Sequence, residues 1–115
     1  MAASDARFAA QIVAPAEEPR FFDDVGCLGS YVKGKRGELP KRALAYVADH
    51  RTKAWVRAEG AVYTRVEGLQ TPMGSHVVAH ADLASQDADP ESRGGSPVTL
   101  AELFGPEGPP DGGRP

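Results

Sequence analysis

The stretch "RALAYVADH" at residues 42–50 decides the fold that this sequence predicts. Leu44 and Tyr46 fall on one side of an extended chain here, and Ala45 and Val47 fall on the other. Successive side chains of a β-strand point to opposite faces, so these residues suit an extended chain. We therefore expect residues 42–50 to contain a strand.

The residues after this strand predict more short strands. "KAWVRAEGAVYTRVEG" at 53–68 has two extended runs flanking a turn at "AEG", and "HVVAH" at 76–80 follows a Pro-Met-Gly turn. Gly, Pro and polar residues at the boundaries are typical of strand ends. Residues 81–95, "ADLASQDADPESRGG", are polar and rich in turn formers.

The C-terminal part predicts one helix and a tail. "SPVTLAELFG" at 96–105 offers Ser96 as N-cap, Pro97 at the first helical position and Gly105 as the stop. Residues 106–115, "PEGPPDGGRP", have little apolar surface to bury, so we expect them to be disordered.

The residues before 42 predict a hairpin and a helix. "RFAAQIV" at 7–13 and "PRFF" at 19–22 are extended runs joined by a Pro- and Glu-rich loop. "DDVGCLGSYVK" at 23–33 opens on aspartates, which are common N-caps, and then shows helical spacing. A loop follows at 34–41, with two glycines and a proline.

The element order is therefore β-β-α-β followed by β-β-β-α. We predict an α+β domain over residues 1–105, built of two similar small ββαβ-type units with antiparallel sheets. The units run from about 5–50 and about 51–105, and the disordered Pro/Gly-rich tail covers 106–115.

Length and charge limit the classes of function. The chain has 115 residues, 41% hydrophobic and 25% charged, which suits one globular domain with one core. The net charge of −3 does not favour a nucleic-acid partner. One local basic cluster is best interpreted as a solvated loop, although it could also dock an acidic partner: Lys33, Lys35, Arg36, Lys41 and Arg42.

Neither a membrane span nor a signal peptide is expected within these residues. No apolar run approaches the roughly 18 residues that a span requires. The opening "MAASDARFAAQ" lacks a basic region and a long apolar region. The only cysteine, Cys27, cannot form an intrachain disulfide, so its thiol is free or bound to a ligand.

A thiol, a thioether and imidazoles are the candidate site groups. A helix N-terminus at Cys27 favours thiolate while nearby aspartates oppose it; the alternative is a small buried apolar residue. Met73 lies in a turn, and its alternative role is a lid over the core. His76 and His80 would be about 13 Å apart on a strand, so at most one could bind a given metal. We expect the other, like His50, to lie at the surface.

Soft donors of this kind favour Cu(I). Thiolate, thioether and imidazole suit that ion, whereas Mg²⁺ and Ca²⁺ prefer oxygen. The single cysteine and the absence of a paired Cys/His spacing do not match a structural zinc site.

Several of these stretches, taken together and in order, resemble the NosL family of nitrous oxide reductase accessory proteins. They are "DARFAAQIV", "FDDVGCLGSYV", "AYVADHRTKAWVRAEGAVYTRV" and "TPMGSHVVAH", and they extend from about residue 5 to about residue 83. The specificity comes from the conjunction of "FDDVGC", the Asp-x-x-Thr-x-x-Trp-Val segment from Asp49 to Val56, and "TPMG".

This resemblance implies a copper chaperone rather than an enzyme. Such a protein is periplasmic, usually a lipoprotein, and delivers Cu(I) to nitrous oxide reductase and its assembly machinery for the copper-sulfide centre. The implied fold is a pair of ββαβ-type units resembling the alkylmercury lyase core. The resemblance implies that Met73 is the thioether ligand and that His76 is an extra ligand. It matches Cys27 to the family's cysteine, which is either a ligand or a structural residue.

The chain departs from the family pattern at its start. The family usually has a Cys-x-x-Cys-x-Met segment of soft donors just before the "Asp-x-Arg-Phe" stretch. Here Met1 falls where that methionine would be, which makes it a further candidate metal ligand, and the cysteines are absent. Either the start is trimmed or misassigned, which we favour, or this member lacks part of its site. A lipid anchor would then belong to a longer form, and we expect weaker Cu(I) binding without the upstream thiolates.

Two other functions remain open at this stage. One is a metal-free protein-interaction domain in which Met73 and Cys27 only pack. The other is an organomercurial-lyase-like enzyme, for which Cys27 with Asp24 gives only one thiol and one acid.

Overall fold

The structure is a computed structural model, and it describes residues 5–112 of the chain. Its strands are β1 (Ala10–Val13), β2 (Arg20–Phe22), β3 (Leu44–Ala48), β4 (Trp55–Arg57), β5 (Val62–Arg65), β6 (Val77–His80) and β7 (Ser96–Val98). Its helices are α1 (Val25–Gly34), α2 (Leu83–Ala88) and α3 (Leu100–Phe104), with short 3-10 turns at η1 (Ala6–Phe8), η2 (Arg36–Glu38), η3 (Ala58–Gly60) and η4 (Pro90–Ser92).

A four-stranded antiparallel sheet forms around the strand predicted at 42–50. Its order is β2-β1-β3-β4, so β3 lies inside the sheet, between β1 and β4. The register places Ile12 opposite Ala45 and Val47 opposite Val56. Ala45 and Val47 are fully buried, as the apolar alternation requires for an inner strand with one face against the core.

A second, three-stranded antiparallel sheet has the order β6-β5-β7. The turn predicted at "AEG" is η3, and it carries the chain from β4 in the first sheet to β5 in the second. The predicted α+β class with small antiparallel sheets is therefore confirmed. Because β4 pairs with β3, the first sheet takes strands from both sides of residue 50.

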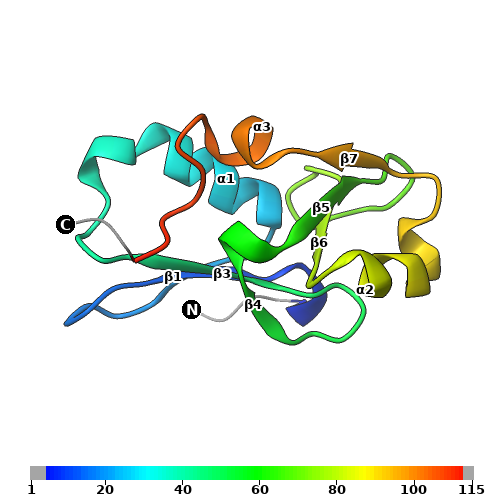
Figure 1. Ribbon diagram of the computed structural model, residues 1–115, viewed down its shortest axis with the longest axis horizontal. Coiled ribbons are helices and arrows are strands. Elements are labelled where there is room, and N and C mark those ends of the chain that lie inside the picture. The colour runs from blue at the N-terminus through cyan, green and yellow to red at the C-terminus, as the bar shows by residue number, and fades with distance from the viewer. Residues whose placement is uncertain (1–4, 113–115) are drawn as a thin grey trace.

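The predicted first helix is confirmed as α1. The carboxylate of Asp24 caps it by accepting a hydrogen bond from Gly26 N at 2.8 Å. Figure 1 shows α1 and α3 side by side over the four-stranded sheet, with the three-stranded sheet beyond them. Lys33 Nζ joins the two helices by donating to Glu102 O at 3.0 Å.

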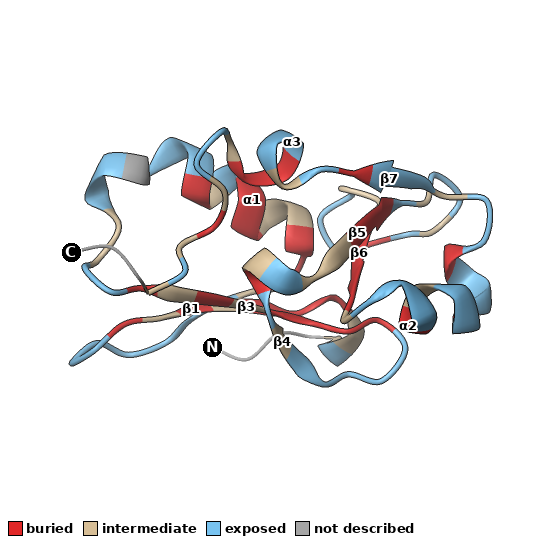
Figure 2. Cartoon of the chain, viewed as in Figure 1, coloured by how far each residue is buried: buried red, intermediate tan, exposed pale blue. Residues whose placement is uncertain are grey.

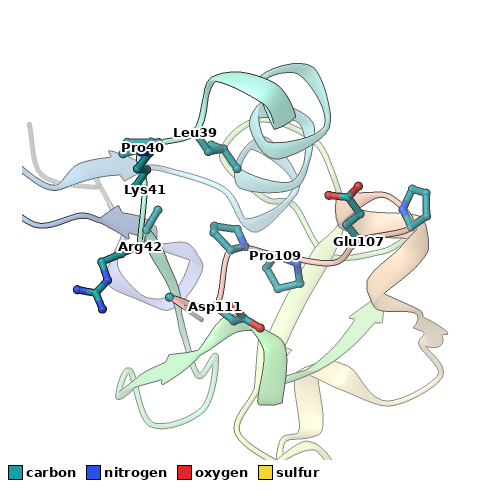
Figure 3. A pocket seen from close by; sticks show the side chains of 11 residues that line it. Leu39, Pro40, Lys41, Arg42, Glu107, Pro109 and Asp111 are labelled. Carbon is teal, nitrogen blue, oxygen red and sulfur yellow. The ribbon is translucent and has the colours of Figure 1, made fainter. Parts of the chain in front are cut away.

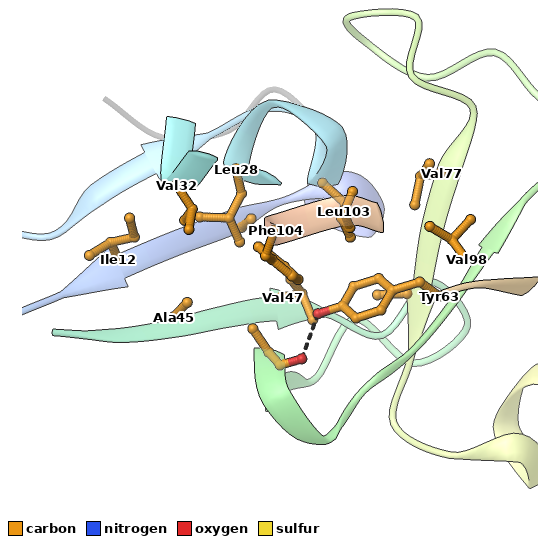
Figure 4. Packing of buried hydrophobic residues seen from close by; sticks show 14 of the residues in the cluster. Ile12, Leu28, Val32, Ala45, Val47, Tyr63, Val77, Val98, Leu103 and Phe104 are labelled. Carbon is orange, nitrogen blue, oxygen red and sulfur yellow. Dashed lines mark hydrogen bonds between the residues drawn. The ribbon is translucent and has the colours of Figure 1, made fainter. Parts of the chain in front are cut away.

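Both sheets and both of these helices share one hydrophobic core. Figure 2 shows the buried residues gathered between the layers, and Figure 4 shows their packing. Phe104 is fully buried and its ring meets that of Tyr63 edge-on at 5.7 Å. The Tyr63 hydroxyl donates to Ala58 O at 2.7 Å, so this buried polar group is paired. The core includes Val25, Leu28, Val32, Ala45, Val47, Val77, Ala79, Val98 and Leu103.

A glycine sets the close approach of α1 and α3. A Cβ atom at Gly29 would lie 2.4 Å from Leu103 O and 2.9 Å from Leu103 Cδ1, which is too close for real atoms. Glycine lowers helix propensity, yet at this position it lets a second helix pack against α1.

The C-terminal region differs from its prediction. Ser96 and Pro97 belong to β7, whose residues pair with β5, so Ser96 is not a helix N-cap. The helix starts later, because Thr99 and Glu102 form a capping box, and it ends at the predicted Gly105. The polar stretch 81–95 also contains the short helix α2, which the turn-rich composition concealed.

The prediction of a disordered tail at 106–115 is wrong for the residues next to β3. Ala45 N donates to Pro110 O at 3.1 Å, and Asp111 forms an isolated bridge with Leu44. Backbone hydrogen bonding to the first residues of β3, which β4 does not pair with, holds this segment without needing apolar side chains. Residues 113–115 lie outside the described part of the chain.

No helix within residues 5–112 has the length and apolar character needed to cross a bilayer.

Candidate functional site

The carboxylate of Asp24 joins the start of α1 to the loop of residues 71–75. Its Oδ2 accepts from Thr71 Oγ1 at 2.7 Å and from Met73 N at 2.9 Å. Its Oδ1 accepts from Gly26 N and from the hydroxyl of Ser75. Burial alone would raise the pKa of Asp24, but these hydrogen bonds outweigh burial and hold the pKa below its usual value. The carboxylate is therefore ionised and fixes the 71–75 loop in place.

The loop also needs glycine at position 26 of the facing helix. A Cβ atom at Gly26 would lie 2.3 Å from Ser75 Cβ, so only glycine lets the loop reach this position. The first turn of α1, which contains Cys27, and the loop that contains Met73 are thus packed directly against each other.

Met73 presents its thioether to solvent. The residue is 65% exposed, while its backbone N–H is held by Asp24 and Gly74 N donates to Thr71 O at 3.0 Å. Gly74 has a φ of +78°, a conformation that favours glycine. Met73 is therefore not a lid over the core, but an exposed sulfur on a hydrogen-bonded loop.

Cys27 is half-buried in the first turn of α1. Burial raises the pKa of its thiol, and the charges of Asp24 and Asp23 raise it further. The sequence suggests that the helix N-terminus lowers the pKa of this thiol and that the aspartates raise it. The aspartates prevail, with burial acting in the same direction, so the thiol is protonated at neutral pH. A metal that binds here as a thiolate complex must displace that proton.

His76 lies between the loop and β6 rather than on the strand. Its φ is +63°, and its backbone N–H donates to Thr71 Oγ1 at 3.1 Å. Its Nδ1 is 2.9 Å from Leu69 O. A carbonyl oxygen only accepts, so Nδ1 carries the proton and Nε2 carries the lone pair of the neutral ring. Metal-binding histidines commonly have this second contact to a carbonyl.

The prediction of surface positions for His50 and His80 is wrong. His80 is fully buried on β6, with Nε2 2.8 Å from Asp89 Oδ2, and His50 is 2% exposed, with Nε2 2.6 Å from Glu91 Oε1. Their ring centroids are 6.2 Å apart. The even spacing of His76 and His80 suggested one strand face, but β6 is buried on both faces and His76 is not part of it.

Asp49, the first residue of the Asp-x-x-Thr-x-x-Trp-Val segment, has a structural role. Its fully buried carboxylate accepts from Ala81 N at 2.7 Å and Ser85 Oγ at 2.8 Å, and from the backbone N–H groups of Arg51 and Thr52. Burial raises the pKa of Asp49, but these hydrogen bonds lower it to about 2. The sequence analysis did not identify this role; an Asp directly after a predicted strand is the signal that could have done so.

Of the predicted ligands, the structure brings the segments of Cys27, Met73 and His76 together, while Met1 lies outside the described residues. Across residues 5–112, no three histidine, cysteine or acidic side chains gather as a metal site. A metal site at this position would therefore depend on the methionine sulfur.

A separate hollow lies on another part of the molecule. It has a volume of about 820 Å³ between residues 39–43 and 106–112, and Lys41 and Arg42 are on one wall with Glu107 and Asp111 on the other (Figure 3). Part of the predicted basic cluster therefore lines this hollow together with acidic residues of the tail.

Comparisons with protein families, with curated proteins and with solved structures found no match to this chain.

Proposed function

We propose that this chain binds Cu(I) and passes it on as a copper chaperone in the maturation of nitrous oxide reductase. The observation that carries the proposal is the contact through Asp24: the "FDDVGC" and "TPMG" segments, which give the sequence its resemblance to the NosL family, meet at one carboxylate. Cu(I) is the cargo in this role, not a resident cofactor.

The donor chemistry supports a transferable soft ion. An exposed thioether is a neutral ligand that neither loses a proton on binding nor gains one on release. Cys27 supplies the stronger donor, but only after deprotonation against a raised pKa, which weakens the complex. His76 adds an imidazole whose orientation is fixed by Leu69 O. Loose binding suits a protein that must give the metal away.

The same resemblance extends the proposed role to the periplasm and to a lipid-anchored longer form. Nitrous oxide reductase and its assembly machinery would then receive the metal, and nucleic acid has no part in the proposal.

The test is an anaerobic Cu(I) titration against a chromophoric Cu(I) chelator, comparing the wild type with Met73→Leu. Leucine keeps the bulk of the side chain but removes the sulfur, and because that side chain is mostly exposed the fold should be unaffected. We expect about one Cu(I) per chain and at least roughly tenfold weaker binding in Met73→Leu, as for loss of one ligand.

Leu83→Ala serves as the matched control, because Leu83 is a similarly exposed apolar residue on α2, at 63%. It should bind Cu(I) as the wild type does. Equal affinities for the wild type and Met73→Leu would show that the thioether is not a ligand.

A second candidate is a metal-free protein-interaction domain, which the hollow between 39–43 and 106–112 favours. Its basic wall could receive an acidic partner. Reversing the charges of Lys41 and Arg42 should then abolish partner binding without changing Cu(I) binding. A chaperone site at Met73 predicts instead that only substitutions of the metal ligands weaken Cu(I) binding.

A further inference from the structure

We propose that Met73 is a site of reversible oxidation, at which a peroxide converts the thioether to a sulfoxide without unfolding the protein. Met73 is the only methionine among the described residues. Its reaction does not depend on the proposed function, but the consequence for Cu(I) binding does.

The first support is the placement of the sulfur. Met73 is 65% exposed as a residue, and the hydrogen bonds of the 71–75 loop hold its backbone in that position. A peroxide can therefore reach the sulfur in the folded protein, with no local opening.

The second support is that the loop does not use the Met73 side chain. The hydrogen bonds that fix it come from Thr71 Oγ1, the hydroxyl of Ser75 and backbone N–H groups, and most of them are donated to Asp24. An oxygen atom added at the thioether disturbs none of these contacts, and the sulfoxide projects into water. This separates Met73 from a core methionine, where the same change would disrupt packing.

The third support is that the sulfur of Cys27 is less accessible to peroxide than that of Met73. Cys27 is half-buried in the first turn of α1, whereas Met73 is 65% exposed, and the oxidation of a sulfur side chain follows its exposure. Oxygen should therefore go to Met73.

The reaction is a two-electron oxygen transfer. The sulfur lone pair attacks one oxygen of hydrogen peroxide, an S–O bond forms, the O–O bond breaks, and the leaving hydroxide takes the proton of the transferred oxygen, which gives the sulfoxide and water. Sulfur is oxidised and the peroxide is reduced. The product replaces a soft sulfur donor by a polar S–O group, which is a poor ligand for Cu(I).

The test exposes the chain to hydrogen peroxide at about pH 5 and follows each sulfur by peptide mass spectrometry, in the folded protein and in urea. We expect Met73 to gain one oxygen at rates within about threefold in the two states, with Cys27 still a free thiol and the circular dichroism unchanged. Protection of folded Met73 by more than about tenfold, earlier oxidation of Cys27, or loss of folded structure would overturn the proposal.

A second measurement links the modification to the metal. The oxidised chain should lose Cu(I) affinity to the level of Met73→Leu and regain it on treatment with methionine sulfoxide reductase, and peroxide should leave the affinity of Met73→Leu unchanged. If Met73 is oxidised but the affinity of the wild type never differed from that of Met73→Leu, the modification stands and the proposed function fails.

Discussion

Two buried aspartates organise the loops of this protein at the scale of single residues. Asp24 holds the 71–75 loop against α1, and Asp49 holds the residues after β3 against the start of α2. In each case hydrogen bonds from several donors stabilise an ionised carboxylate inside the protein, where an unpaired charge would be costly. The pKa of each is lowered for this reason.

These lowered pKa values predict acid sensitivity with a definite sign. A carboxyl group whose pKa falls on folding stabilises the protein above its unfolded pKa and loses that contribution as the pH falls through its folded pKa. For Asp49 the window runs from about pH 3.8 down to about pH 2. The free energy of unfolding, measured by urea denaturation, should fall steeply across it.

Asp49→Asn provides the control, because it cannot ionise. The stability gap between the wild type and Asp49→Asn should shrink as the pH falls from about 4 to about 2. A gap that stays constant over this range would contradict the role given to the Asp49 charge.

At the scale of elements, local signals in the sequence predicted some boundaries well and others poorly. The start of α1 after Asp24 and the end of α3 at Gly105 are predicted correctly, because capping depends on residues close by in the sequence. Ser96 and Thr99 both resemble N-caps, and pairing of Ser96 with Arg65 on β5, a contact distant in sequence, decides between them. The same holds for the tail, which is ordered by its contact with β3.

The glycines of α1 give an element-scale prediction. Gly29→Ala should destabilise the fold by roughly 1–3 kcal/mol, because its methyl group would overlap Leu103 O, 2.4 Å from the Cβ position. Gly34→Ala is the matched control: nothing lies within 4 Å of its Cβ position, so the better helix former should stabilise α1 by up to about 1 kcal/mol. Both effects are measurable by thermal or urea unfolding, and equal effects would contradict the packing of α1 against α3.

At the scale of the whole molecule, the fold class followed from the sequence but the site only in part. Strand alternation gives small antiparallel sheets, and those are observed. The meeting of Cys27 and Met73 segments could not be derived from spacing, because it depends on a carboxylate and a glycine that bridge 47 residues or more. Burial of His50 and His80 also depends on tertiary contacts: Glu91, the partner of His50, is 41 residues away, and Asp89, the partner of His80, is nine residues away beyond α2.

The central claim is that the first turn of α1 and the 71–75 loop form one soft-metal site. The most direct measurement is an anaerobic Cu(I) titration of protein labelled with ¹³C at the methionine methyl and the cysteine Cβ, observed by NMR. Met73 and Cys27 should shift together and complete their change at about one equivalent of Cu(I), with the Met73 signal assigned from its absence in Met73→Leu. A Met73 or Cys27 resonance that stays unmoved through that equivalent would contradict the shared site.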